Sequence, residues 1–145
     1  MKGKGSLVRS SEDQSKLKTK LKELTSRSNG WGYEKRKEKL AYVIRGWVNY
    51  FRLAEMHNFL RETDEWLRSR IRMCIWKSWK RVRTRFKNLQ RCGIAKWQAW
   101  QWANTRKGYW RTVHSPILKR AMSNENLKRA HYPTLMEYYE KLHPR

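Results

Sequence analysis

Cationic and aromatic side chains are combined, without a single carboxylate, in the segment RMCIWKSWKRVRTRF, residues 72–86. Lysine and arginine bind phosphate groups, while aromatic rings and guanidinium planes stack on unpaired bases. A fully buried helix would not carry so many charges, and a solvated basic tail would not carry Trp76 and Trp79. The composition of this segment therefore favours a surface that binds nucleic acid, and RNA in particular.

The positive charge of the chain is concentrated rather than spread. The formal net charge of the 145 residues is +23, and residues 66–124 contain 16 Lys or Arg and no Asp or Glu. A compact chain with this charge repels itself, so we expect an anionic partner, either nucleic acid or a membrane surface. No run of about 18 apolar residues is present to cross a membrane. A helix lying on a membrane is disfavoured because core stripes account for most apolar positions. We therefore expect no membrane partner.

Groups that could support catalysis or metal binding are sparse. The tightest acidic cluster is Glu62, Asp64 and Glu65, near a predicted helix start, where the helix dipole or a salt bridge accounts for it. Cys74 and Cys92 form no CxxC pattern and have no histidine at zinc spacing. We expect structural or exposed roles for the four histidines, His57, His114, His131 and His143. The sequence predicts no catalytic residue, no metal site, no cofactor and no small-molecule substrate.

The first helix is predicted to follow a candidate capping box formed by Ser11 and Gln14. Its apolar face consists of Leu17, Leu21 and Leu24. The segment Ser26–Tyr33 ends this helix, because it contains Asn-Gly and a second glycine.

A second helix is predicted from about Glu34 to Glu55. Its apolar stripe has a period near 3.6 residues and consists of Leu40, Val43, Ile44, Trp47, Phe51 and Ala54. Gly46 lies inside this helix, where it either weakens the helix or marks a close crossing with another one.

A third helix is predicted from about Phe59 to Lys80, with Asn58 as its N-cap. Its core stripe consists of Leu60, Leu67, Ile71, Cys74, Ile75 and Ser78. Trp76 falls nearly opposite this stripe, which leaves two interpretations open. Either the C-terminal helices cover the ring, or the ring helps to form a binding surface.

Shorter helices are predicted in the rest of the chain. Thr84 is a candidate cap for a helix that ends at Gly93, and a further helix spans about Ala95 to Asn104. The RKGYWR segment, residues 106–111, is predicted to be a turn. Further helix starts are predicted at Ser115-Pro116, Ser123 and Pro133.

The predicted fold class follows from these elements. No alternating β pattern is present, so we expect an all-α bundle with two long helices plus several shorter C-terminal helices. We expect residues 1–10 to be a disordered lead-in and residues 11–145 to form a single RNA-binding domain.

Specific motifs occur in order in three segments: IRGWVNYFRLAE, DEWLRSRIRMCIWKSWKRVRTRFKNLQRCGI and KGYWRTVHSPILKRAMSNENL. Together they strongly resemble the maturase-specific domain of group II intron-encoded reverse transcriptases, a region also called domain X or the thumb. The resemblance covers about Leu17 to Leu142. It implies an α-helical, thumb-like domain that grips structured intron RNA and helps it to fold for splicing.

The resemblance also supplies candidate residues for contact with RNA. In the RGW…NYFR stretch the candidates are Arg45 and Arg52. The basic block, which we define as the cations from Arg68 to Lys87, supplies Arg68, Arg70, Arg72, Lys77, Lys80, Arg81, Arg83, Arg85 and Lys87. The KGYWR segment and the arginine before it supply Arg106, Lys107, Tyr109, Trp110 and Arg111. Trp76 joins these candidates as an aromatic ring among the cations.

The resemblance implies that the chain binds RNA, but it does not imply catalysis. A Y-x-D-D-type polymerase segment and an H-N-H endonuclease pattern are absent from the sequence. We expect a non-enzymatic maturase module of the bacterial cytoplasm, whose partner is group II intron RNA. An alternative is the detached thumb of a reverse transcriptase, which grips the template–primer duplex for a palm and fingers polypeptide on another chain. A third possibility is a decayed reading frame that binds any polyanion.

Overall fold

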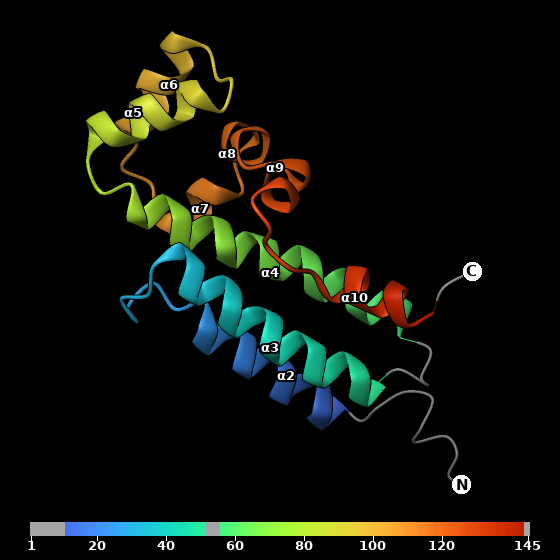
Figure 1. The fold of residues 1–145 in the computed structure, drawn as a ribbon. Helices are drawn as coiled ribbons and strands as arrows, with labels where there is room; N and C mark the ends of the chain where they lie inside the picture. Colours follow the sequence, from blue (N-terminus) through green and yellow to red (C-terminus); the bar gives the residue numbers. More distant parts are fainter. Residues whose placement is uncertain (1–10, 52–55, 144–145) are drawn as a thin grey trace, which may run out of the picture. The chain divides into compact units, whose positions relative to one another are not determined.

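The computed structural model describes residues 11–51 and 56–143, and every regular element in that part of the chain is an α-helix (Figure 1). The all-α prediction is confirmed, with α3 and α4 as the two longest helices. The predicted lead-in, residues 1–10, lies outside the described residues. In chain order the helices are α2 Ser11–Leu24, α3 Tyr33–Phe51, α4 His57–Ser78, α5 Val82–Arg91, α6 Lys96–Ala103, α7 Tyr109–Val113, α8 Pro116–Ala121, α9 Asn124–Arg129 and α10 Leu135–Leu142.

The helices divide into two compact units, and the boundary between them falls within α4. The first unit contains the described residues up to Leu67 together with those from Tyr132 onward. The second unit contains Arg68–His131. The prediction of a single domain over residues 11–145 stays a prediction.

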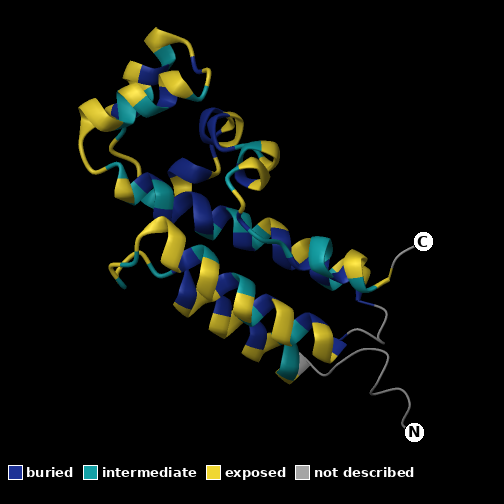
Figure 2. Cartoon of the chain, in the orientation of Figure 1, coloured by how far each residue is buried: buried dark blue, intermediate teal, exposed yellow. Residues whose placement is uncertain are grey.

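In the first unit, α2 and α3 run side by side in opposite directions, and α10 packs on α3 (Figure 1). The predicted face of α2 is correct, because Leu17, Leu21 and Leu24 are all buried. The buried face of α3 is rotated from the predicted stripe, and Figure 2 shows how buried and exposed positions alternate along this helix. Val43 and Trp47 are only half-buried, and Ala54 lies outside the described residues. The buried residues of α3 are Arg36, Leu40, Ile44, Val48 and Phe51.

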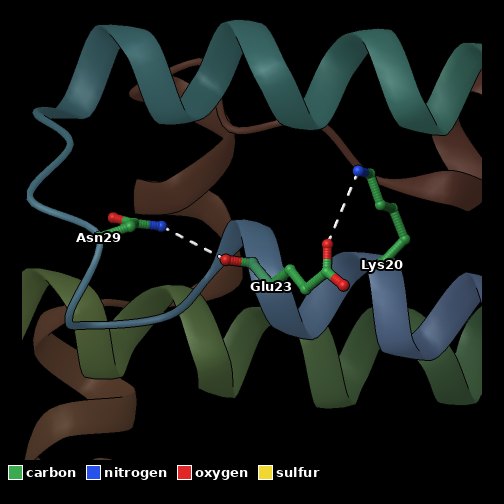
Figure 3. A network of polar contacts seen from close by, with 3 residues as sticks. All are labelled: Lys20, Glu23 and Asn29. Atoms are coloured by element: carbon green, nitrogen blue, oxygen red, sulfur yellow. Dashed lines mark hydrogen bonds and ion pairs between the residues drawn. The ribbon is translucent and has the colours of Figure 1, made fainter.

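The turn between α2 and α3 is held by side chains that bond to its backbone. Gly30 adopts φ 72°, a left-handed conformation that glycine tolerates without strain. The Asn29 amide donates to the Glu23 carbonyl at 3.3 Å, and Glu23 also pairs with Lys20 at 3.6 Å (Figure 3). The buried Arg36 guanidinium donates to the Leu24 carbonyl at 2.8 Å and to the Trp31 carbonyl at 3.2 Å. Arg36 is therefore a structural cation, which the sequence analysis did not single out.

The helix α4 begins at His57, two residues earlier than predicted. Asn58 thus lies in its first turn, where its side-chain oxygen accepts a bond from Arg61 at 3.2 Å, and the prediction of Asn58 as N-cap is wrong. Ile75 is half-buried and Ser78 is exposed, so the core stripe ends earlier than predicted. The other predicted stripe residues are buried: Leu60, Leu67, Ile71 and Cys74.

In the second unit, α5 and α6 pack against each other around a turn at Gly93. Gly93 adopts φ 93°, and the N–H of Ile94 donates to the Leu89 carbonyl at 3.0 Å. The N–H of Gly93 donates to the Gln90 carbonyl at 2.9 Å, which completes a Schellman motif. The predicted end at Gly93 is correct, but α5 starts after Arg81, so Thr84 lies in its first turn and is not its cap.

The remaining helix starts are largely as predicted. The hydroxyl of Ser115 accepts from Leu118 N–H and that of Ser123 accepts from Asn126 N–H, as expected for N-caps. The last helix is capped by Thr134 rather than opened by Pro133. The KGYWR segment is also different from the prediction, because a helix and not a turn begins at Tyr109. A short helix escapes prediction there because five residues are too few to show periodicity.

Candidate nucleic-acid interface

Two candidate contacts in α4 are buried instead of exposed. Trp76 is 1% exposed, so protein covers the ring, as the first of the two interpretations proposed. Arg72 is 6% exposed and donates to the Met122 carbonyl at 2.7 Å and to the Asn124 side chain at 2.9 Å. Burial, and after it the charge of Arg68, lowers the pKa of the Arg72 guanidinium. Both side chains are therefore packed inside protein.

Arg85 links α5 to α4 through the ring of Trp76. Its guanidinium lies 4.3 Å from the centre of that ring, and its Nη2 donates to the Trp76 carbonyl at 3.4 Å. The centre of the Tyr109 ring is 5.9 Å away. The Nε atom of Arg85 is buried and has no hydrogen-bond partner within the described part of the chain. The cation–π contacts therefore account for the position of Arg85, which points to a packing role.

The exposed members of the basic block gather at the start of α5. They are Lys80, Arg81, Arg83 and Lys87, whereas Arg68, Arg70 and Lys77 are half-buried. The N-cap of α5 is Arg81, whose side chain makes no capping hydrogen bond, and the first turn of α5 contains no acid. The N-terminus of a helix carries a partial positive charge, so cations at this end repel it. The arrangement is stabilised when an anion binds there.

The next two helices of the second unit begin in the same way. The N-caps of α6 and α7 are Ala95 and Gly108, neither of which offers a side-chain acceptor, and neither first turn contains an acid. Exposed cations flank both starts: Lys96 at α6, and Arg106, Lys107 and Arg111 at α7. By contrast, hydroxyl groups cap α8, α9 and α10. Among α5 to α10, the starts whose N-cap side chain accepts no hydrogen bond are therefore those of α5, α6 and α7.

The KGYWR segment places aromatic rings next to its cations. The Lys107 ammonium lies 4.9 Å from the centre of the Trp102 ring. Tyr109 is half-buried, while Trp110 is exposed and meets His114 edge-on at 4.6 Å. The segment therefore presents Trp110 and the cations to solvent, and Tyr109 belongs partly to the packing.

A groove of about 910 Å³ lies between α2, α3 and α10 in the first unit, and Arg45 is part of its lining. Two tyrosines of α3 line it as well, and Tyr42 is 73% exposed. Gly46 lies in the same groove, and a methyl group added there would meet no atom within 4 Å in the described residues. The interpretation of Gly46 as a close helix crossing is therefore wrong. Arg52, the other candidate of this stretch, lies outside the described residues.

The most exposed tryptophans belong to α6, and the sequence analysis did not place them among the RNA contacts. Trp97 is 69% exposed and Trp100 is 56% exposed. The signal was present in the spacing of the small residues, because Ala99 and Ala103 are four apart and both are buried. A helix that buries its alanines against α5 turns Trp97 and Trp100 outward.

No three His, Cys, Asp or Glu side chains in residues 11–51 and 56–143 gather to hold a metal ion. In the same ranges, no helix is long and apolar enough to span a membrane. Burial raises the pKa of the Cys92 thiol, which makes it less reactive than a free cysteine.

The family is decided by a comparison with models of known protein families. The model of the group II intron maturase-specific domain matches residues 14–93, which is more than half of the chain. The chain belongs to this family. The match runs from α2 to the Gly93 turn, so the maturase-specific domain includes the whole basic block. The KGYWR segment and the α6 tryptophans lie beyond the matched residues. No curated protein matches the chain.

Proposed function

We propose that this maturase-specific domain binds structured group II intron RNA and promotes its folding and splicing without catalysing a reaction itself. The observation that carries the proposal is the set of three uncapped, acid-free helix starts of α5, α6 and α7, each flanked by exposed cations. RNA phosphates can accept bonds from the free backbone N–H groups and neutralise the cations at the same time. Membership of the maturase-specific family supports group II intron RNA as this polyanion.

The candidate contacts are revised by their burial. We exclude Trp76, Arg72 and Arg85, because these side chains are engaged in packing. We expect smaller contributions to RNA binding from the half-buried residues, which are Arg68, Arg70, Lys77 and Tyr109. The main proposed contacts are Arg45, Lys80, Arg81, Arg83, Lys87, Arg106, Lys107, Trp110 and Arg111.

The mechanism follows from binding alone. A protein surface of fixed shape binds the native arrangement of phosphates better than a misfolded one, so it shifts the RNA population toward the native fold. The shift cannot exceed the difference in binding free energy between the two RNA states. Promotion of splicing then requires no catalytic group in the protein.

The test is affinity as a function of salt for a group II intron RNA, an unrelated structured RNA of equal length and a DNA duplex. A preference for the intron RNA that persists at 200 mM salt, together with faster formation of native intron on a native gel, is the expected result. Three equal affinities that fall together with salt would indicate a generic polyanion binder and contradict the proposal.

The alternative, a thumb for a polymerase on another chain, is favoured by one observation. The α2–α3–α10 groove has a mainly apolar lining that includes Tyr42, Val43 and Trp47, and a partner protein could cover it. Co-purification with a palm and fingers polypeptide, lost when Tyr42 is changed to Asp, would support this function.

A further inference from the structure

An aromatic hollow lies on the α5–α6 pair, and its α6 residues lie beyond the part of the chain that the family model matches. It is lined by Phe86, Lys96, Trp97 and Trp100 and has a volume of about 580 Å³. The rings of Phe86 and Trp100 meet edge-on, with 5.3 Å between their centres. This contact holds the Trp100 ring on one side of the hollow. The Trp97 side chain is 69% exposed, and its ring contacts no other aromatic ring in the described residues.

The exposure of the Trp97 and Trp100 rings is unfavourable in the chain by itself. Exposing two tryptophans leaves a large apolar area unburied, and Trp97 makes no ring contact in the described residues that would account for its position. The helix α6 already packs on α5 through its buried alanines, Ala99 and Ala103. The rings of Trp97 and Trp100 are therefore available to an external ligand.

The charges around the hollow select the kind of ligand. Lys96 is part of its lining, and Arg83 lies one helical turn from Phe86 on the surface of α5. No acid occurs between residues 66 and 124. A second copy of the chain is disfavoured as the occupant, because two molecules of charge +23 repel each other. A ligand that offers flat rings and negative charge together fits both features.

We infer that the hollow formed by Phe86, Lys96, Trp97 and Trp100 is a stacking site for an unpaired base of the bound RNA, with Lys96 on the adjacent phosphate. The inference rests on the proposed RNA-binding function and adds a specific preference to it. Single-stranded loops and bulges can place a base there, whereas the stacked bases of a continuous duplex cannot. Stacking of a base on an aromatic side chain contributes about 5- to 150-fold in affinity.

The experiment compares two short oligonucleotides in binding to the full chain. One is an RNA octamer of adenines, and the other has the same length and phosphates but abasic sugars at every position. The variant is Trp97→Ala, which removes the most exposed ring, and circular dichroism checks its helical content. We expect the variant to lose 5-fold or more in affinity for the adenine octamer and to bind the abasic octamer as the wild type does.

Two further variants serve as controls. Trp97→Tyr keeps an aromatic face and should restore most of the lost affinity. Tyr33→Ala removes an exposed ring of α3, in the first unit, and should leave the affinity for both oligonucleotides unchanged. Trp100→Ala should repeat the effect of Trp97→Ala, provided that the α5–α6 pair keeps its helical content.

The outcomes separate this inference from the proposed function. Equal loss for both oligonucleotides, or no loss for either, would overturn the stacking site and leave the hollow as a surface for a protein partner. If the wild-type chain binds adenine and abasic octamers equally but still prefers intron RNA, only the stacking site fails. If it does not bind intron RNA at all, the proposed function fails first.

Discussion

The carboxylate of Asp64 accepts a hydrogen bond from the backbone N–H of Leu135 at 2.7 Å, although the two residues are 71 positions apart. It also accepts from the N–H of Met136 at 2.9 Å, and the hydroxyl of Thr134 accepts from Glu137 N–H at 3.1 Å. Together these groups satisfy the first three N–H groups of α10. Asp64 therefore caps the start of α10, and the acidic cluster predicted to serve the start of α4 contains a residue that serves another helix.

The first prediction concerns this cap. Asp64→Ala leaves two N–H groups of α10 without acceptors, and Leu135 is buried. We expect the variant to lose about 1–3 kcal/mol in the free energy of unfolding. Asp64→Asn keeps one acceptor oxygen and should lose less. Urea denaturation followed by circular dichroism measures both values.

Glu65→Ala is the matched control, because Glu65 is an exposed acid next to Asp64 on the same helix. This variant should change the free energy of unfolding by less than about 0.5 kcal/mol. Equal effects of Asp64→Ala and Glu65→Ala would mean that the carboxylate of Asp64 does not support α10.

The features that could be predicted from the sequence are those whose partners are close along the chain. The caps at Ser115 and Ser123 were predictable because the acceptor and the donor are three residues apart. The capping role of Asp64 could not be predicted, because the N–H groups that donate to it lie on a helix near the other end of the sequence. The burial of Arg72 could not be predicted for the same reason, since its acceptor on Met122 is 50 residues away.

The basic charge of the candidate surface was predictable from the sequence, whereas the burial of its aromatic residues was predictable only in part. The absence of acids from residues 66–124 located the basic surface correctly in sequence, although the exposure of each cation depends on packing. The sequence left open whether Trp76 is covered, because the periodicity of α4 shows only the core face of that helix. It cannot show that Arg85 and other protein groups cover the opposite face.

The second prediction uses the glycine of the α2–α3–α10 groove. Glycine in a helix interior costs about 0.5–1 kcal/mol relative to alanine, and a methyl group at Gly46 meets no atom within 4 Å in the described residues. We therefore expect Gly46→Ala to raise the free energy of unfolding by about 0.5–1 kcal/mol. Urea denaturation midpoints of the variant and the wild type measure the change.

Gly93→Ala is the same type of substitution, but we expect it to lower the free energy of unfolding. Gly93 has φ 93°, so an alanine there is strained and should lower stability by about 1–2 kcal/mol. If Gly46→Ala also lowers the free energy of unfolding, a part of the chain must approach that position more closely than the structure shows.

The third prediction separates two arginines of α5 that lie two residues apart. Arg85 stacks on the buried Trp76, so Arg85→Gln should lower the free energy of unfolding by about 0.5–2 kcal/mol. Arg83 is exposed, so Arg83→Gln should change it by less than about 0.5 kcal/mol and weaken RNA binding instead. Thermal melting and RNA affinity, measured on both variants, check the two expectations. The opposite pattern, in which Arg83→Gln lowers stability and Arg85→Gln does not, would contradict the assignment of Arg85 to packing.

The fourth prediction concerns the exposed cations at the start of α5. Changing Arg81, Arg83 and Lys87 together to Gln should weaken binding to intron RNA and flatten its salt dependence. Each phosphate contact that is lost reduces the slope of log K against log salt by roughly 0.7 to 0.9.

A control variant of equal charge distinguishes local contacts from the net charge of the chain. Lys22, Lys39 and Lys141 are exposed residues of the first unit, and changing them to Gln also removes three charges. If the α5 cations contact phosphates directly, only the α5 variant should show the smaller slope of log K against log salt that corresponds to three lost contacts. Charges that make no phosphate contact release no counterions from the RNA, so the control variant should keep the wild-type slope. Equal slopes for the two variants would show that the chain binds through its overall charge, and the helix starts of α5, α6 and α7 would then have no special part in recognition.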